Sequence, residues 1–86
     1  MTDKVHFAVR TIDGEHREFN EPPETLLATV RDVAFERFHI QPAPGQQWIF
    51  QLNGRNLDNG QTLHQAGVTD GSNLLFGTTD VLGDGR

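Results

Sequence analysis

The sequence predicts a single small α+β domain in which a mixed sheet of four to five strands wraps around one helix. Three observations lead to this prediction. The chain has 86 residues, which is enough for one core and little else. Apolar residues alternate with polar ones near the N-terminus, as in a half-buried strand, and recur every three or four positions from residue 26, as in an amphipathic helix. Glycine-containing turns separate the remaining apolar segments.

The first element is a β-hairpin. Val5, Phe7 and Val9 form one face of a strand, and an Asp-Gly pair follows at residues 13–14. Because Asp-Gly between alternating segments is a strong hairpin signal, the chain is expected to return over residues 15–20.

One helix of three to four turns follows the hairpin. Two prolines at residues 22–23 break the strand, and Thr25 offers a hydroxyl as the N-cap. The apolar stripe of the helix consists of Leu26, Leu27, Val30, Val33, Ala34 and Phe38. Phe35 lies off this stripe and is interpreted as a rim contact or, alternatively, as an exposed docking residue.

The second half of the chain predicts two strands, at residues 48–52 and 73–76, and a short helical turn capped by Thr62. The crossover through the helix is expected to make the strand that follows it parallel to an existing strand. The domain is assigned to residues 1–78. Residues 79–86 are polar and contain glycine, so they are expected to form a flexible C-terminal tail.

Composition excludes several functions. The chain lacks cysteine, and its histidines have no metal-ligand spacing, so we expect no metal, no cofactor and no catalysis. A net charge of −5 disfavours nucleic acid. No apolar run approaches the roughly 18 residues of a membrane span, and the N-terminal residues do not resemble a signal peptide. A cytoplasmic protein without membrane contact is expected.

Residues 5–14, 48–63 and 68–74 resemble three parts of the ubiquitin-like β-grasp family: the opening hairpin, the strand with its Gly-basic turn and Leu-acid-x-Gly loop, and the approach to the last strand. The bacterial members found with activating enzymes, conjugating enzymes and metallopeptidases look most similar, since their tails also carry Gly-x-Gly. The resemblance implies a non-enzymatic protein modifier that is activated with ATP and joined to target amines, with a role in antiphage defence.

The resemblance also implies which residues react. Removal of Arg86 by a peptidase leaves Gly85 as the conjugated residue, and cleavage after Gly83, which also removes Asp84, is the alternative. Glycine suits a narrow enzyme channel because it adds flexibility without bulk. Lys4 is the only lysine, so it is the one internal side chain available for self-attachment.

A partner surface is expected on the open face of the sheet beside the tail. Its residues are His6, Ala8, Arg10, Ile12, Gln51 and Gly77. By the resemblance, Gln51 and Gly77 stand where aliphatic residues are usual, so standard ubiquitin-binding modules are expected to bind poorly. An ordinary solvated sheet face is the alternative interpretation. A second function also stays open, that of a non-conjugated adaptor or interaction domain such as those associated with type VII secretion.

Overall fold

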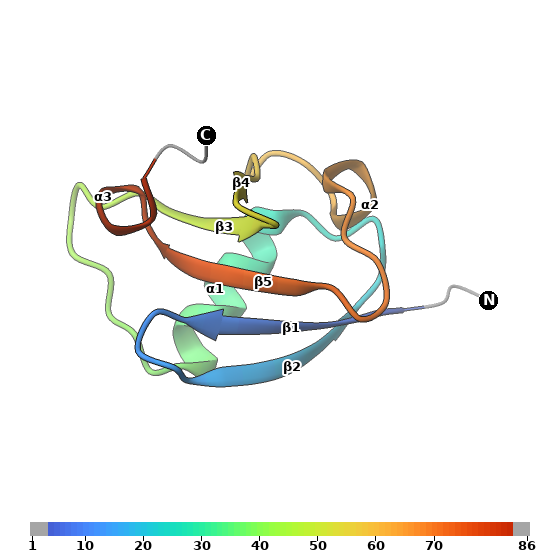
Figure 1. Ribbon diagram of the computed structural model, residues 1–86, viewed down its shortest axis with the longest axis horizontal. Coiled ribbons are helices and arrows are strands. Elements are labelled where there is room, and N and C mark those ends of the chain that lie inside the picture. The colour runs from blue at the N-terminus through green and yellow to red at the C-terminus, as the bar shows by residue number, and fades with distance from the viewer. Residues whose placement is uncertain (1–3, 84–86) are drawn as a thin grey trace.

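The computed structural model describes residues 4–83, which form a five-stranded mixed sheet with a helix across one face (Figure 1). This confirms the predicted α+β class. In chain order the elements are β1 (Val5–Thr11), β2 (His16–Glu21), α1 (Leu27–Arg37), β3 (Trp48–Leu52), β4 (Arg55–Asn56), α2 (Leu63–Ala66), β5 (Asn73–Thr78) and α3 (Thr79–Leu82). Within the described range, no helix is long and apolar enough to cross a bilayer.

The sheet has the strand order β2-β1-β5-β3-β4. β1 and β2 form the predicted antiparallel hairpin, and Gly14 in its turn has φ +94°, a value that glycine adopts without strain. β1 pairs in parallel with β5, and β3 is antiparallel to both of its neighbours, β5 and β4. β3 therefore runs in the same direction as β2, which confirms that the strand after the helix is parallel to an existing strand. The two strands do not pair, because β1 and β5 lie between them.

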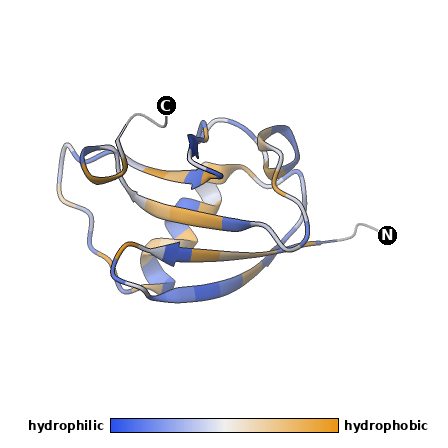
Figure 2. Ribbon diagram, viewed as in Figure 1, coloured by the Kyte–Doolittle hydropathy of each residue, from blue (hydrophilic) through white to orange (hydrophobic). Residues whose placement is uncertain are grey.

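The core lies between α1 and the sheet face that α1 covers, and apolar residues are interspersed with polar ones along the strands (Figure 2). The alternation in β1 behaves as predicted, since Phe7 and Val9 are buried while His6 and Arg10 are exposed. A strand has a side-chain period of two, so one face can be apolar and the other polar.

Aromatic side chains extend this core towards one end of the sheet. The rings of Phe50 and Phe76 stack with their centroids 4.7 Å apart. Phe35 packs edge-on against Trp48, with 5.5 Å between the ring centroids. Phe35 is half-buried, so its interpretation as a rim contact is confirmed.

The start of α1 differs from the prediction. Leu26, not Thr25, is the N-cap residue, and no side chain caps the helix. The first two N–H groups of α1 donate instead to the backbone carbonyls of Gln61 and Asn59, at 2.9 and 3.0 Å. Because these loop carbonyls satisfy donors that a side chain would otherwise bond, the cap is dispensable. Leu26 is 44% exposed, so its predicted place in the apolar stripe of the helix is wrong.

The short helix α2 forms as predicted. Thr62 Oγ1 accepts a hydrogen bond from the Gln65 N–H, and the Gln65 side chain accepts one from the Thr62 N–H, which completes a capping box. Leu63, Ala66 and Val68 are buried behind it.

Candidate functional site

The sheet face that turns away from α1, here called the outer face, carries most of the expected partner surface. In β1 it presents His6, Ala8 and Arg10, of which Ala8 is half-buried and the other two are exposed. His6 Nε2 lies 2.6 Å from Glu18 Oε1 of β2. Both side chains are more than half exposed, so this pair contributes little to stability. Ile12 is 63% exposed at the hairpin turn. Of the six predicted residues, His6, Arg10 and Ile12 are therefore exposed, and Ala8 is partly so.

Gln51 and Gly77 do not belong to the accessible part of this face. Gln51 is only 8% exposed and Gly77 is buried. α3 folds back over them, so the expectation that they lie on an open face is wrong. Both residues instead contact Leu82 within the chain.

The docking of α3 also corrects the expected extent of the tail. Residues 79–82 form a helical turn, and the Gly83 N–H donates to the Thr79 carbonyl at 3.0 Å. At the start of α3, the Thr79 N–H donates to the Gln47 carbonyl at 3.0 Å. The chain is therefore directed back over the sheet immediately after β5 instead of leaving it.

Two side-chain amides hold the end of α3. Gln51 Nε2 donates to the Leu82 carbonyl at 3.2 Å and to Asn56 Oδ1 at 2.8 Å. Asn56 Nδ2 donates to the Gly83 carbonyl at 3.2 Å. The Leu82 side chain lies over Gly77, where an added Cβ would be 3.2 Å from Leu82 Cγ. The absence of a side chain at residue 77 thus permits the close approach.

Asn56 and Leu82 were not identifiable as contact residues from the sequence. The only local signal is an apolar pair, Val81-Leu82, one turn after two threonines, and it does not show which strand the pair contacts. Gly83 is exposed, with φ +80°. Asp84, Gly85 and Arg86, on which the predicted processing and the first choice of conjugated residue depend, lie outside the described residues.

The described part of the chain contains no group of three or more His, Cys, Asp or Glu side chains able to hold a metal ion. Its polar contacts hold the hairpin, α2 and α3 in place.

Solved structures of other proteins share this arrangement. The chain matches the ubiquitin of Caldiarchaeum subterraneum with a TM-score of 0.74 and 21% identity over 87% of this chain and 92% of that one. The chain has the ubiquitin-like fold. A protein designed de novo on the basis of ubiquitin matches with a TM-score of 0.73 and 23% identity, over 87% of this chain and 88% of the designed one.

The ubiquitin-like fold also occurs as part of a longer protein. The N-terminal ubiquitin-like domain of the 4931431F19Rik protein matches with a TM-score of 0.72 and 18% identity, over 90% of this chain and 76% of that one. No family model and no curated protein match the sequence. At these identities the likeness concerns the fold and not the activity.

Proposed function

We propose that this chain is a bacterial ubiquitin-like protein modifier, joined through Gly85 or Gly83 to an amine of a target protein. The observation that carries the proposal is the position of Gly83, which is exposed at the end of α3. No residue of α3 is buried, and the carbonyls of Leu82 and Gly83, at its end, accept hydrogen bonds from the side-chain amides of Gln51 and Asn56. This end of the chain can therefore be drawn out without opening the core.

Release of α3 lengthens the segment that an activating enzyme can bind. Residues 79–85, fully extended from the end of β5, span at most about 24 Å, since each residue contributes about 3.4 Å. With α3 docked, only the residues beyond Gly83 are available. We infer that the enzyme acts on the released form.

In the proposed reaction a metallopeptidase first exposes the glycine carboxylate. The activating enzyme joins this carboxylate to the α-phosphate of ATP and releases pyrophosphate. An enzyme thiolate then displaces AMP to form a thioester, and the target amine displaces the thiol. The fold and the Gly-x-Gly at residues 83–85 support this assignment, and the resemblance to bacterial members supports a role in antiphage defence.

Single attachment is the proposed product. Lys4 is the only lysine of the chain, and it is exposed immediately before β1. Arginine side chains remain protonated and are poor nucleophiles, so chains of this modifier require Lys4 or the N-terminal amine.

The alternative is a non-conjugated interaction domain, for example one associated with type VII secretion. The docking of α3 favours it, because a tail bonded to Gln51 and Asn56 acts as part of the domain. The likeness to a ubiquitin-like domain within a longer protein is also consistent with this role.

Incubation with ATP and with the activating and conjugating enzymes of a bacterial ubiquitin-like system tests the proposal. We expect a mass shift equal to one target protein, with a tryptic branch peptide that places the new bond at Gly85 or Gly83. A chain ending at Thr78, whose fold is checked by circular dichroism, serves as the control. If the full chain forms no adenylate, thioester or adduct, and the shortened chain retains all activity in the cell, the interaction domain is the correct function.

A further inference from the structure

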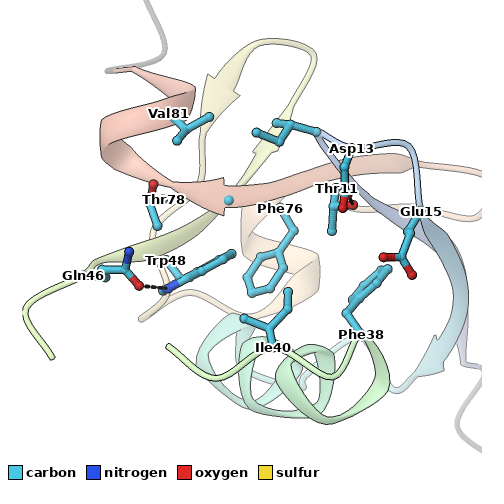
Figure 3. A pocket seen from close by; sticks show the side chains of 12 residues that line it. Thr11, Asp13, Glu15, Phe38, Ile40, Gln46, Trp48, Phe76, Thr78 and Val81 are labelled. Atoms are coloured by element: carbon cyan, nitrogen blue, oxygen red, sulfur yellow. Dashed lines mark hydrogen bonds between the residues drawn. The ribbon is translucent and has the colours of Figure 1, made fainter. Parts of the chain in front are cut away.

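A groove lies at one end of the molecule, between the hairpin turn, the loop after α1, and α3 (Figure 3). Its volume is about 410 Å³, within the roughly 300–1,000 Å³ of pockets that hold small ligands. Phe38, Ile40, Trp48 and Phe76 gather along one side of it, and Val81 of α3 lies opposite them (Figure 3). The groove therefore has apolar side chains on both sides.

Exposed apolar side chains converge on this groove. Three large hydrophobic side chains are exposed among residues 4–83, and two of them, Ile12 at 63% and Val81 at 57%, line it. They come from opposite ends of the sequence, and both line the groove because α3 turns back over the sheet directly after β5. An exposed apolar patch that gathers distant segments is typical of an interaction site. Leu26, the third exposed residue, is not part of the groove.

The described residues that line the groove carry only negative charges. Within residues 4–83, Asp13 and Glu15 are the charged lining residues, and no lysine, arginine or histidine of that range lines the groove. Asp13 accepts a hydrogen bond from the Thr11 hydroxyl and has no cationic partner within the described residues. Glu15 forms an exposed ion pair with Arg17 at 3.5 Å, a contact that a competing cation can replace at little cost. The chain as a whole carries a net charge of −5, which adds to the attraction for a basic segment.

We propose that this groove binds a partner segment in which large apolar side chains stand next to lysine or arginine. An apolar side chain enters between Ile12 and Val81, and the neighbouring cation pairs with Asp13 or Glu15. This interaction goes beyond conjugation, since it uses the folded domain with α3 docked and needs no reactive C-terminus. Because Val81 of α3 lines the groove, the partner binds the chain with α3 docked and not the chain with α3 released.

Trp48 provides a direct probe because it is the only tryptophan of the chain and lines the groove. The probe ligand is the acetylated, amidated nonapeptide Gly-Ser-Leu-Leu-Arg-Leu-Arg-Ser-Gly, titrated against the full chain. We expect saturable changes in Trp48 fluorescence and NMR shifts confined to the Ile12 and Val81 methyl groups and the Trp48 indole. A peptide with glutamate in place of both arginines should bind at least about tenfold more weakly.

Variants of the three exposed apolar residues give matched comparisons. I12S and V81S should each weaken binding about fivefold or more, since each removes apolar contact area, whereas L26S should leave binding unchanged. D13N combined with E15Q should weaken binding and flatten its dependence on salt. Heteronuclear NMR spectra of each variant confirm that the domain is folded.

The proposal is overturned if the basic peptide does not bind up to millimolar concentration. Equal binding of the acidic peptide, equal weakening by L26S, or shifts that map elsewhere also overturn it. Sedimentation showing that I12S and V81S abolish a dimer of the free chain would identify a second copy, and not a basic segment, as the occupant. None of these readouts involves conjugation, so they are independent of the function proposed above.

Discussion

Replacing Gly77 with valine should release α3 while leaving the domain folded. A Cβ at this position alone would lie 3.2, 3.3 and 3.5 Å from three atoms of the Leu82 side chain, and valine adds two further methyl groups. Leu82 must therefore move away, and the hydrogen bonds from Gln51 and Asn56 to the Leu82 and Gly83 carbonyls are lost with it. The strand itself gains, because glycine inside a strand is unfavourable by roughly 0.5–1 kcal/mol.

The size of the effect follows from these two bonds. Each contributes about 1 kcal/mol, so the opening of α3 becomes about 2 kcal/mol easier. Since 1.4 kcal/mol corresponds to a factor of ten, the population of the open form should rise by up to about thirtyfold. The amide of Gly83, which bonds the Thr79 carbonyl in the docked form, should then exchange with solvent up to about thirtyfold faster, whereas the midpoint of thermal unfolding should not fall.

Amide exchange measured by NMR at several pH values tests this prediction. N56A is a graded control that removes one of the two bonds, so its Gly83 amide should exchange only about fivefold faster. If Gly83 exchange in G77V matches that of the unchanged chain, the close packing of Leu82 on Gly77 does not hold α3 in place. A large loss of thermal stability in G77V would show instead that α3 is part of the cooperative core.

Two further predictions concern stability. T62A breaks the capping box of α2 and should cost about 1 kcal/mol, which lowers the thermal midpoint of a domain of this size by about 4–8 °C; a midpoint within 1 °C of the unchanged chain would contradict the role of the cap. F50A removes a fully buried ring that stacks on Phe76 and should cost about 3–5 kcal/mol, a large part of the total stability. Urea unfolding should show a clearly lower midpoint, and a loss below about 1 kcal/mol would mean that the core repacks around the cavity.

Much of the fold was predictable because the relevant signals are local. The period-two pattern of β1, the Asp-Gly turn and the N-cap at Thr62 each act over a few residues, and each has the expected form. The pairing of β3 was not predictable in this way. Its partner β5 lies more than twenty residues later in the sequence, and the position of β5 in the sheet is set by packing.

The start of α1 shows how tertiary contacts replace a local signal. Thr25 has the side chain of an N-cap residue, yet loop carbonyls from residues 59 and 61 bond the first helical amides. No spacing rule within the helix reveals those partners. The helix therefore forms as predicted while its boundary and cap differ.

The candidate site was also predictable only in part. The accessibility of His6, Arg10 and Ile12 followed from strand alternation and the hairpin turn. The burial of Gln51 and Gly77 did not, because it depends on a C-terminal turn whose polar composition suggested no fixed structure. No feature of the sequence predicts that Asn56 donates a hydrogen bond to the Gly83 carbonyl.

The sequence by itself determined which segments are strands and helices and which of their faces are apolar, because these properties depend on neighbours a few residues apart. The tertiary structure alone decided where α3 rests and that Ile12 and Val81 face one groove. Both features depend on residues from the two ends of the chain lying near one another. This arrangement exists only when β5 lies between β1 and β3. The side chains that hold the end of α3 are therefore set by packing in three dimensions, and no local pattern predicts them.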